Sequence, residues 1–235
     1  MEEFDRNSIL YEDNHIIVVN KRAGQIVQGD KSGDTPLSEL VSAFIAKRDK
    51  KPGAAFIGVP HRIDRPVSGI AMFAKTSKAL ARLNEMFRDG TIQKIYWAIV
   101  PQKPALSEGE LKGYITRNEK QNKSYISETP KPGSKDAALL YKHLLSGDNY
   151  QLLEITLLTG RHHQIRAQLA YSIAPIKGDL KYGARRSNPD GSISLHARSI
   201  KFIHPVKREE IYVEAPVPED SLWLWFEERA VGVRL

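Results

Sequence analysis

Cysteine is absent from all 235 residues of this sequence. Its absence excludes disulfide bonds, catalysis by a thiolate, and zinc sites with cysteine ligands. It also fits a protein of a reducing compartment, so we expect the cytoplasm. The sequence contains no apolar run of about 18 residues, the length that crosses a membrane. Residues 1–10 are acidic and polar, so we expect no secretory signal.

Acidic residues are too few to balance the basic ones. The chain has 35 Lys and Arg against 28 Asp and Glu, a formal net charge of +7. Net charge informs about partners rather than about fold. A polyanion, and nucleic acid first, is the natural partner of such a chain, although a merely basic globular protein is the alternative.

Hydrophobic patterning predicts many strands and a few helices. The predicted strands are 15–20, 69–75, 93–100, 111–117, 123–128, 138–145, 150–158, 194–202 and 209–216. The predicted helices are 35–47 with Thr35 as its N-cap, 77–90 with Ser77 as its cap, a helix within 159–172, and 219–230. The segment 138–145 is ambiguous, because a short apolar run fits a helix as well as a strand.

These elements predict an α+β fold in a single domain over residues 1–235. Strands dominate, and no repeat, low-complexity tract or long linker divides them. We therefore expect one large mixed, mainly antiparallel β-sheet flanked by helices. Too few residues precede Ile9 for a separate N-terminal RNA-binding domain, so we expect none.

Three stretches carry residues suited to chemistry. HRIDRP (61–66) holds Asp64 between two arginines, KIYWAIV (94–100) holds Tyr96 among apolar neighbours, and TGRHHQIR (159–166) combines a glycine turn with two arginines and two histidines. Each also has a structural interpretation. Asp64 can be a turn residue paired with Arg65, and Tyr96 can be a half-buried strand tyrosine.

Histidine offers little sign of a metal site. His162 and His163 are adjacent and lack the i, i+4 spacing of a helical metal pair, and no HExxH motif occurs. We therefore expect no metal, and since the sequence also contains no motif for a redox cofactor or a nucleotide, we expect no cofactor.

In combination, these stretches resemble the RluA-type family of RNA pseudouridine synthases. HRIDRPVSGIAMFAKT (61–76) is similar to the catalytic loop of that family, and KIYWAIV to its tyrosine strand. TGRHHQIRAQLA and PIKGDLKYG (175–183) are similar to its arginine motif and the turn after it, and residues 9–24 to its opening strand. The matches follow the family order from about residue 9 to about residue 215. The resemblance implies the pseudouridine synthase fold and an enzyme that isomerises uridine in ribosomal or transfer RNA.

The resemblance also implies roles for individual residues. Asp64 would be the catalytic carboxylate, either attacking the anomeric carbon or removing the neighbouring 2′ proton. Tyr96 would stack on the uracil, and Arg166 would pair with Asp64 and hold it. A hydrolytic glycosidase normally uses two carboxylates, whereas one suffices if cations stabilise a departing uracil anion.

The remaining implied roles concern RNA. Arg62 would help flip the target base, because the reacting atoms are inaccessible inside a helix. Arg161 and Lys75 would bind phosphates. We expect a monomer and no membrane partner. The alternatives are an RNA-binding or ribosome-assembly protein on the same fold, and a nucleoside glycosylase that releases free uracil.

Some positions depart from the family pattern. Val67 stands where threonine is usual, Arg22 where proline is usual, and Gln168 where histidine is usual. None removes a catalytic group, so the departures concern RNA contacts and hence the identity of the substrate.

Overall fold

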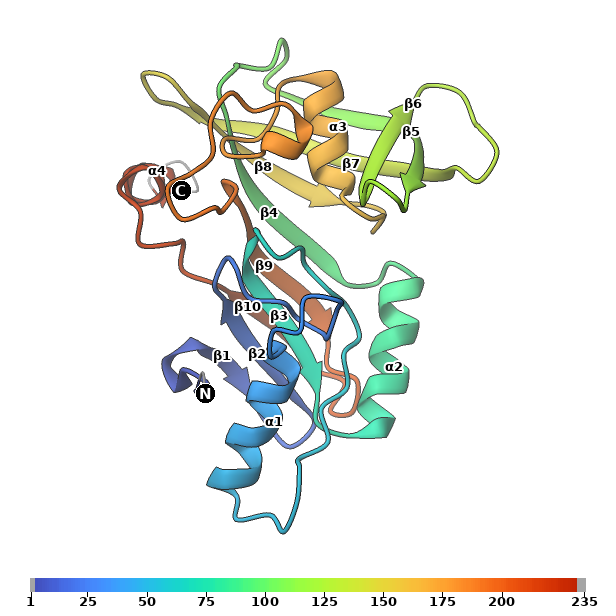
Figure 1. Ribbon diagram of the computed structural model, residues 1–235, viewed down its shortest axis with the longest axis vertical. Coiled ribbons are helices and arrows are strands. Elements are labelled where there is room, and N and C mark those ends of the chain that lie inside the picture. The colour runs from blue at the N-terminus through green and yellow to red at the C-terminus, as the bar shows by residue number, and fades with distance from the viewer. Residues whose placement is uncertain (1–2, 232–235) are drawn as a thin grey trace. The chain divides into compact units, whose positions relative to one another are not determined.

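The computed structural model describes residues 3–231, which fall into two compact units (Figure 1). The first unit is Met1–Gln93 with Ala197–Pro216, and the second is Lys94–His196 with Val217–Leu235. The chain therefore leaves the first unit at β4, and β9 carries it back.

The first unit is built on antiparallel strands with two helices. Its strands follow the hydrogen-bonded order β1-β2-β3-β9, and β10 pairs with β9. The elements are η1 (Arg6–Ser8), β1 (Ile9–Glu12), β2 (Ile16–Lys21), α1 (Leu37–Arg48), β3 (Ser68–Ala74), α2 (Ser77–Arg88), β9 (Leu195–Ile203, which begins in the second unit) and β10 (Glu210–Glu214).

The second unit has its own antiparallel strands, in the order β4-β8-β7-β5-β6. Its elements are β4 (Gln93–Val100), β5 (Glu108–Asn118), β6 (Lys123–Ser127), β7 (Lys135–Ser146), β8 (Gln151–Leu157), α3 (Gln164–Ser172), η2 (Leu180–Tyr182) and α4 (Ser221–Val231). Helix α3 packs against β5 and β6, and α4 packs against β7.

Burial explains why these segments form these elements. In the first unit all of β3 and most of β2 are buried, and α2 turns Ala79 and Leu83 inward. The second unit has a separate aromatic core that joins α4 to the strands. Its buried members are Trp97, Ile99, Leu152, Val217, Trp223, Phe226 and Ala230. Each unit thus positions its site residues from a core of its own.

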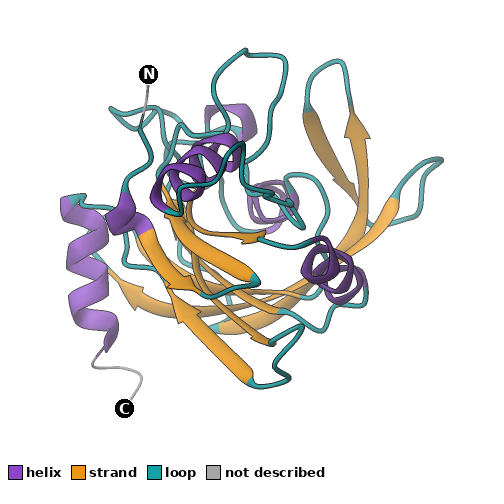
Figure 2. Ribbon diagram, turned by 90° about the horizontal axis from the view of Figure 1, so that it is seen from below, coloured by secondary structure: helices purple, strands orange, loops and turns teal. Residues whose placement is uncertain are grey.

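The predicted fold class is confirmed. Residues 3–231 contain ten strands and four α-helices, and the strands pair mainly antiparallel (Figure 2). The ambiguous segment 138–145 lies in strand β7, where Ala137, Leu139 and Tyr141 are buried in alternation. Such alternation is the strand period.

Both predicted helix caps are wrong by one residue. Helix α1 has Pro36 rather than Thr35 at its N-cap, because the N–H groups of Leu37 and Ser38 donate to carbonyls earlier in the chain. In α2 the cap is Thr76, whose hydroxyl accepts from the N–H of Ala79.

Within residues 3–231, no helix has the length and apolarity that a membrane crossing requires.

Candidate active site

Asp64 lies in a loop of the first unit that leads into β3, and the loop is fixed at its start by His61. The Nε2 of His61 accepts a hydrogen bond from the backbone N–H of Met72 at 3.0 Å. The ring also stacks on Phe87 of α2, with centroids 4.6 Å apart. A turn follows, in which the N–H of Val67 donates to the carbonyl of Asp64. The loop is therefore anchored to both β3 and α2.

The carbonyl of Arg65 anchors the other side of this loop. It accepts a hydrogen bond from the N–H of Gly24 at 2.8 Å, and a second one from the Nζ of Lys21 at 3.1 Å. The same ammonium donates to the carbonyls of Arg22 and Gln25 at 3.0 and 2.8 Å. Lys21 thus ties the end of β2 to the loop that carries Asp64.

Lys21 also brings a positive charge close to Asp64. Its side chain is 1% exposed, which is rare for a lysine. Burial lowers the pKa of Lys21 to about 7, and this effect is opposed by the negative charge of Asp64.

The two arginines that flank Asp64 differ in their surroundings. Arg65 forms an ion pair with Asp34 and donates a hydrogen bond to Ser32 at 3.0 Å. Its guanidinium therefore fastens the loop to residues 30–34. Arg62 is exposed, and its role in base flipping stays a prediction.

Gly69 allows the loop to enter β3. Its φ is +105°, a region that side chains rarely adopt. A Cβ at this position would overlap the backbone of Ala197. The Ser68-Gly69 pair of the motif thus serves close packing of β3 on β9.

Tyr96 lies on β4 of the second unit and is 9% exposed. It pairs with Ile155 of β8. Lys94, two residues earlier, lies on the same face of the strand, because strand side chains alternate with a period of two. Burial lowers the pKa of Lys94, and its Nζ lies 3.7 Å from the position of a Cβ on Gly160. Gly160 is the second residue of the arginine motif, so the ammonium of Lys94 lies beside the start of that motif.

Arg166 lies in α3, where a buried carboxylate fixes its guanidinium. Its Nε donates to Oδ2 of Asp179 at 2.7 Å, and Nη2 donates to Oδ1 at 2.9 Å. The two side chains are 6% and 2% exposed. The Cζ of Arg166 also lies 5.1 Å from the centroid of the Tyr182 ring. Asp179 and Tyr182 belong to the GDLKYG turn, so this turn holds the arginine in one orientation.

Two predicted RNA contacts have different surroundings. Arg161 is exposed, and its Nε donates to the carbonyl of Asp136 at 2.8 Å. Lys75 is mostly buried and donates to Glu12 at 2.5 Å and to the carbonyl of Asp13 at 2.6 Å. These partners tie Lys75 to the end of β1, and its predicted phosphate contact stays a prediction.

The departures from the family pattern also have structural partners. Arg22 is exposed and forms an ion pair with Asp5 at 2.7 Å. Val67 is buried. Gln168 is buried and donates to the carbonyl of Leu111 at 2.8 Å, which attaches α3 to β5.

The predicted catalytic residues are divided between the units. Asp64 belongs to the first unit, whereas Tyr96 and Arg166 belong to the second. The pairing of Asp64 with Arg166 stays a prediction.

Sequence reasoning missed Lys21, Lys94 and Asp179 as members of the site. Lys94 carried a signal, because its i, i+2 spacing from Tyr96 puts both on one face of a strand. Lys21 acts through contacts distant in sequence, so no local pattern marked it, and Asp179 lay in the quoted PIKGDLKYG motif without a role assigned to it.

Comparison with known proteins identifies the family. The model of the family described as RNA pseudouridylate synthase matches residues 15–171, which include Asp64, Tyr96 and Arg166. The ribosomal large subunit pseudouridine synthase C of Vibrio vulnificus is 33% identical over 90% of this chain and 66% of its own length. The ribosomal large subunit pseudouridine synthase D of Xanthomonas campestris is 31% identical over 91% of this chain and 66% of its own length.

A solved structure supports the fold. Human RNA pseudouridylate synthase domain containing 4 has a TM-score of 0.77, with 22% identity over 95% of this chain and 93% of its own. The chain spans just under two thirds of the length of the two bacterial relatives. The match of the family model over most of the chain shows that this protein belongs to the RNA pseudouridylate synthase family.

Proposed function

We propose that this protein isomerises uridine to pseudouridine in RNA, with Asp64 as its catalytic carboxylate and without metal or cofactor. The observation that carries the proposal is the fixed Asp64 loop, bonded to Lys21, Gly24 and Met72 within the matched family region. A carboxylate on a loop held in this way is preorganised for reaction.

The proposed reaction conserves every atom of the uridine. The bond between N1 of uracil and C1′ of the ribose breaks, and a bond between C5 and C1′ forms. The proton on C5 leaves, and N1 gains one. Asp64 either attacks C1′ or removes the 2′ proton. Both roles require an ionised carboxylate.

Further roles are proposed for other residues. Arg166, which Asp179 orients, would hold the Asp64 carboxylate. Tyr96 would stack on the uracil near C5. Arg62 would replace the flipped base in its stack, and Arg161 would bind a phosphate.

We propose ribosomal RNA as the first substrate to test, because both bacterial relatives named above are called ribosomal large subunit pseudouridine synthases. The synthase C and synthase D relatives are about equally similar to this chain, at 33% and 31% identity, so we propose no particular target uridine. Transfer RNA is the alternative substrate. We further propose that the two units work as one catalytic domain, in a cytoplasmic monomer.

The decisive experiment uses large-subunit ribosomal RNA and transfer RNA transcribed with tritium at C5 of uracil. Because C5 loses its hydrogen in the isomerisation, tritium enters water as product forms. We expect release by the wild type and none by Asp64→Asn. Asp89→Asn is the matched control, because it makes the same change at an exposed aspartate of the first unit. It should release tritium at the wild-type rate.

The other outcomes separate the alternatives. Free uracil without tritiated water would identify a glycosylase. Salt-sensitive RNA binding without either product would favour the RNA-binding alternative. Equal release by Asp64→Asn and wild type would remove Asp64 from the mechanism.

A further inference from the structure

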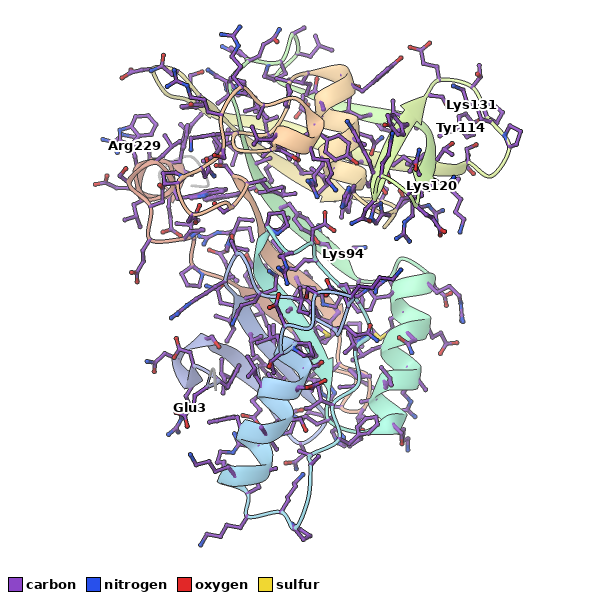
Figure 3. The ribbon with its side chains drawn as sticks, in the orientation of Figure 1. Glu3, Lys94, Tyr114, Lys120, Lys131 and Arg229 are labelled. Atoms are coloured by element: carbon purple, nitrogen blue, oxygen red, sulfur yellow. The ribbon has the colours of Figure 1, made fainter. Side chains whose placement is uncertain are left out.

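The turn between β5 and β6 concentrates positive charge on the second unit. The segment 117–123 contains three basic residues, Arg117, Lys120 and Lys123, and one acidic residue, Glu119. Arg117 and Lys120 are exposed, and Figure 3 labels Lys120 at this turn. The Nζ of Lys123 lies 5.5 Å from the ring centroid of Tyr125, a residue that is 46% exposed. Cations beside an exposed aromatic ring suit the phosphates and unstacked bases of RNA.

This turn is tied to the segments on either side of Arg166. The backbone N–H of Ser124 donates to the Tyr182 hydroxyl at 2.8 Å, and its Oγ donates to the carbonyl of His162 at 2.7 Å. The Nζ of Lys181 donates to the carbonyl of Asn122 at 3.1 Å. A displacement of the turn would therefore also displace His162 and Tyr182.

Tyr182 also contacts the elements that position Arg166. Since its hydroxyl oxygen accepts from Ser124, its proton can be donated to Nδ1 of His163, 3.0 Å away. His163 is the N-cap of α3 and has a φ of 52°, in the left-handed region. The Tyr182 ring lies 5.1 Å from the Cζ of Arg166. One side chain thus contacts the basic turn, the start of α3 and the arginine.

We propose that RNA docks on the β5–β6 turn through Lys120 and its basic neighbours, and that Tyr182 couples this docking to the position of Arg166. The inference rests on the proposed function, because Arg166 matters only if the protein acts on RNA. Tyr182 is a positioning residue, since it acts through Arg166 rather than on the uridine.

The coupling is tested with Tyr182→Phe, which keeps the ring and removes the hydroxyl. Two measurements are compared on tritiated ribosomal RNA: the single-turnover rate at saturating protein, and the Kd from filter binding. We expect the saturating rate to fall about tenfold, because the hydroxyl loses its hydrogen bonds to Ser124 and His163 and the turn no longer fixes the orientation of Arg166. The Kd should stay within about twofold of the wild type, since no basic group is removed.

The matched control is Tyr171→Phe, an exposed tyrosine of α3, the helix that carries Arg166, whose hydroxyl donates to Glu128 at 3.1 Å. It should keep the wild-type rate. A merely structural role for Tyr182 would lower the thermal midpoint without changing the saturating rate of folded enzyme. Equal saturating rates for the two variants would overturn the coupling.

The docking is tested separately with Lys120→Ala, and Lys131→Ala in the loop after β6 is its control. Removing a phosphate contact should weaken RNA binding severalfold and reduce the slope of log K against log salt by about one. Lys131→Ala should change neither quantity. Equal values for the two variants would overturn the docking. If the wild type releases no tritium, the proposed function and the coupling fail, whereas the binding data still decide the docking.

Discussion

Replacing Asp179 by asparagine should destabilise the second unit by about 3–5 kcal/mol, the usual cost of removing one partner of a buried ion pair. Asp179 accepts two hydrogen bonds from Arg166, at 2.7 and 2.9 Å, and the side chains are 2% and 6% exposed. Asparagine keeps the shape but has one acceptor oxygen and no charge. The variant would therefore leave a buried guanidinium without its carboxylate.

Fluorescence reports on this unit alone. All three tryptophans, Trp97, Trp223 and Trp225, belong to the second unit, and the first two are buried. A urea titration followed by tryptophan emission gives the change in free energy from the shift in midpoint. At roughly 2–4 °C per kcal/mol, the thermal midpoint should fall by roughly 6–20 °C.

An exposed ion pair in the same unit is the control. Glu110 lies 2.8 Å from Lys112, and their side chains are 35% and 71% exposed. Glu110→Gln should cost less than about 1 kcal/mol, as exposed pairs do. If Asp179→Asn costs no more than this control, the reasoning about the buried pair is refuted. The double variant Arg166→Met/Asp179→Leu should recover stability, because apolar residues of similar size replace both charges, but it should release no tritium.

Three further predictions concern the first unit. Gly69→Ala should lower the free energy of unfolding by about 2–5 kcal/mol, because it places a side chain at positive φ and against the backbone of Ala197. A loss below about 1 kcal/mol, measured by urea titration followed by circular dichroism, would contradict this packing. Burial lowers the pKa of Lys21 from 10.5 to about 7. The unfolded chain therefore binds more protons between these values, and stability should rise as pH increases from 7 to 10. The urea midpoint of the wild type should therefore rise from pH 7 to pH 10, and that of Lys21→Met should not. A variant whose midpoint still rises would exclude Lys21 as the cause. Burial raises the pKa of Asp13, but hydrogen bonds from the N–H groups of His15 and Ile16 and from Lys207 lower it to about 2. The ionised Asp13 therefore adds to the free energy of unfolding fully above about pH 4, and this contribution is lost as pH falls through about 2. An acid titration of Asp13→Asn should lack this loss of stability. Equal acid midpoints for the variant and the wild type would refute the role of Asp13.

Local patterns predicted most elements of the fold. The strand predicted at 123–128 and the helix predicted at 77–90 both correspond to observed elements, β6 and α2. Cap residues were less predictable. In α1 the first N–H groups donate to the carbonyls of Ile26 and Val27, which lie ten or more residues earlier, so a side-chain cap is not needed there. No pattern within the helix records such a contact.

The same distinction applies to the site. Motif order marked Asp64, Tyr96 and Arg166, and the family match includes all three. The residues that hold them were not marked. The ammonium of Lys21 reaches the carbonyl of Arg65, 44 positions away, and backbone carbonyls attract a lysine without any sequence signature. Asp179 lies 13 positions from Arg166 and is recognisable as its partner only when the turn between them is folded.

The charged groups around Asp64 have different partners from those that the sequence suggests. Two arginines flank the aspartate, but the Arg65 guanidinium pairs with Asp34, and its carbonyl holds Lys21. The buried cation close to Asp64 is therefore a lysine from the opening strand, with a pKa of about 7. A lysine in that range loses its charge as pH rises above neutrality. Lys21→Met removes the three hydrogen bonds that the ammonium donates to the carbonyls of Arg22, Gln25 and Arg65, so the rate of tritium release at saturating RNA should fall in the folded variant. An unchanged rate with intact folding would mean that these hydrogen bonds do not position Asp64 for reaction.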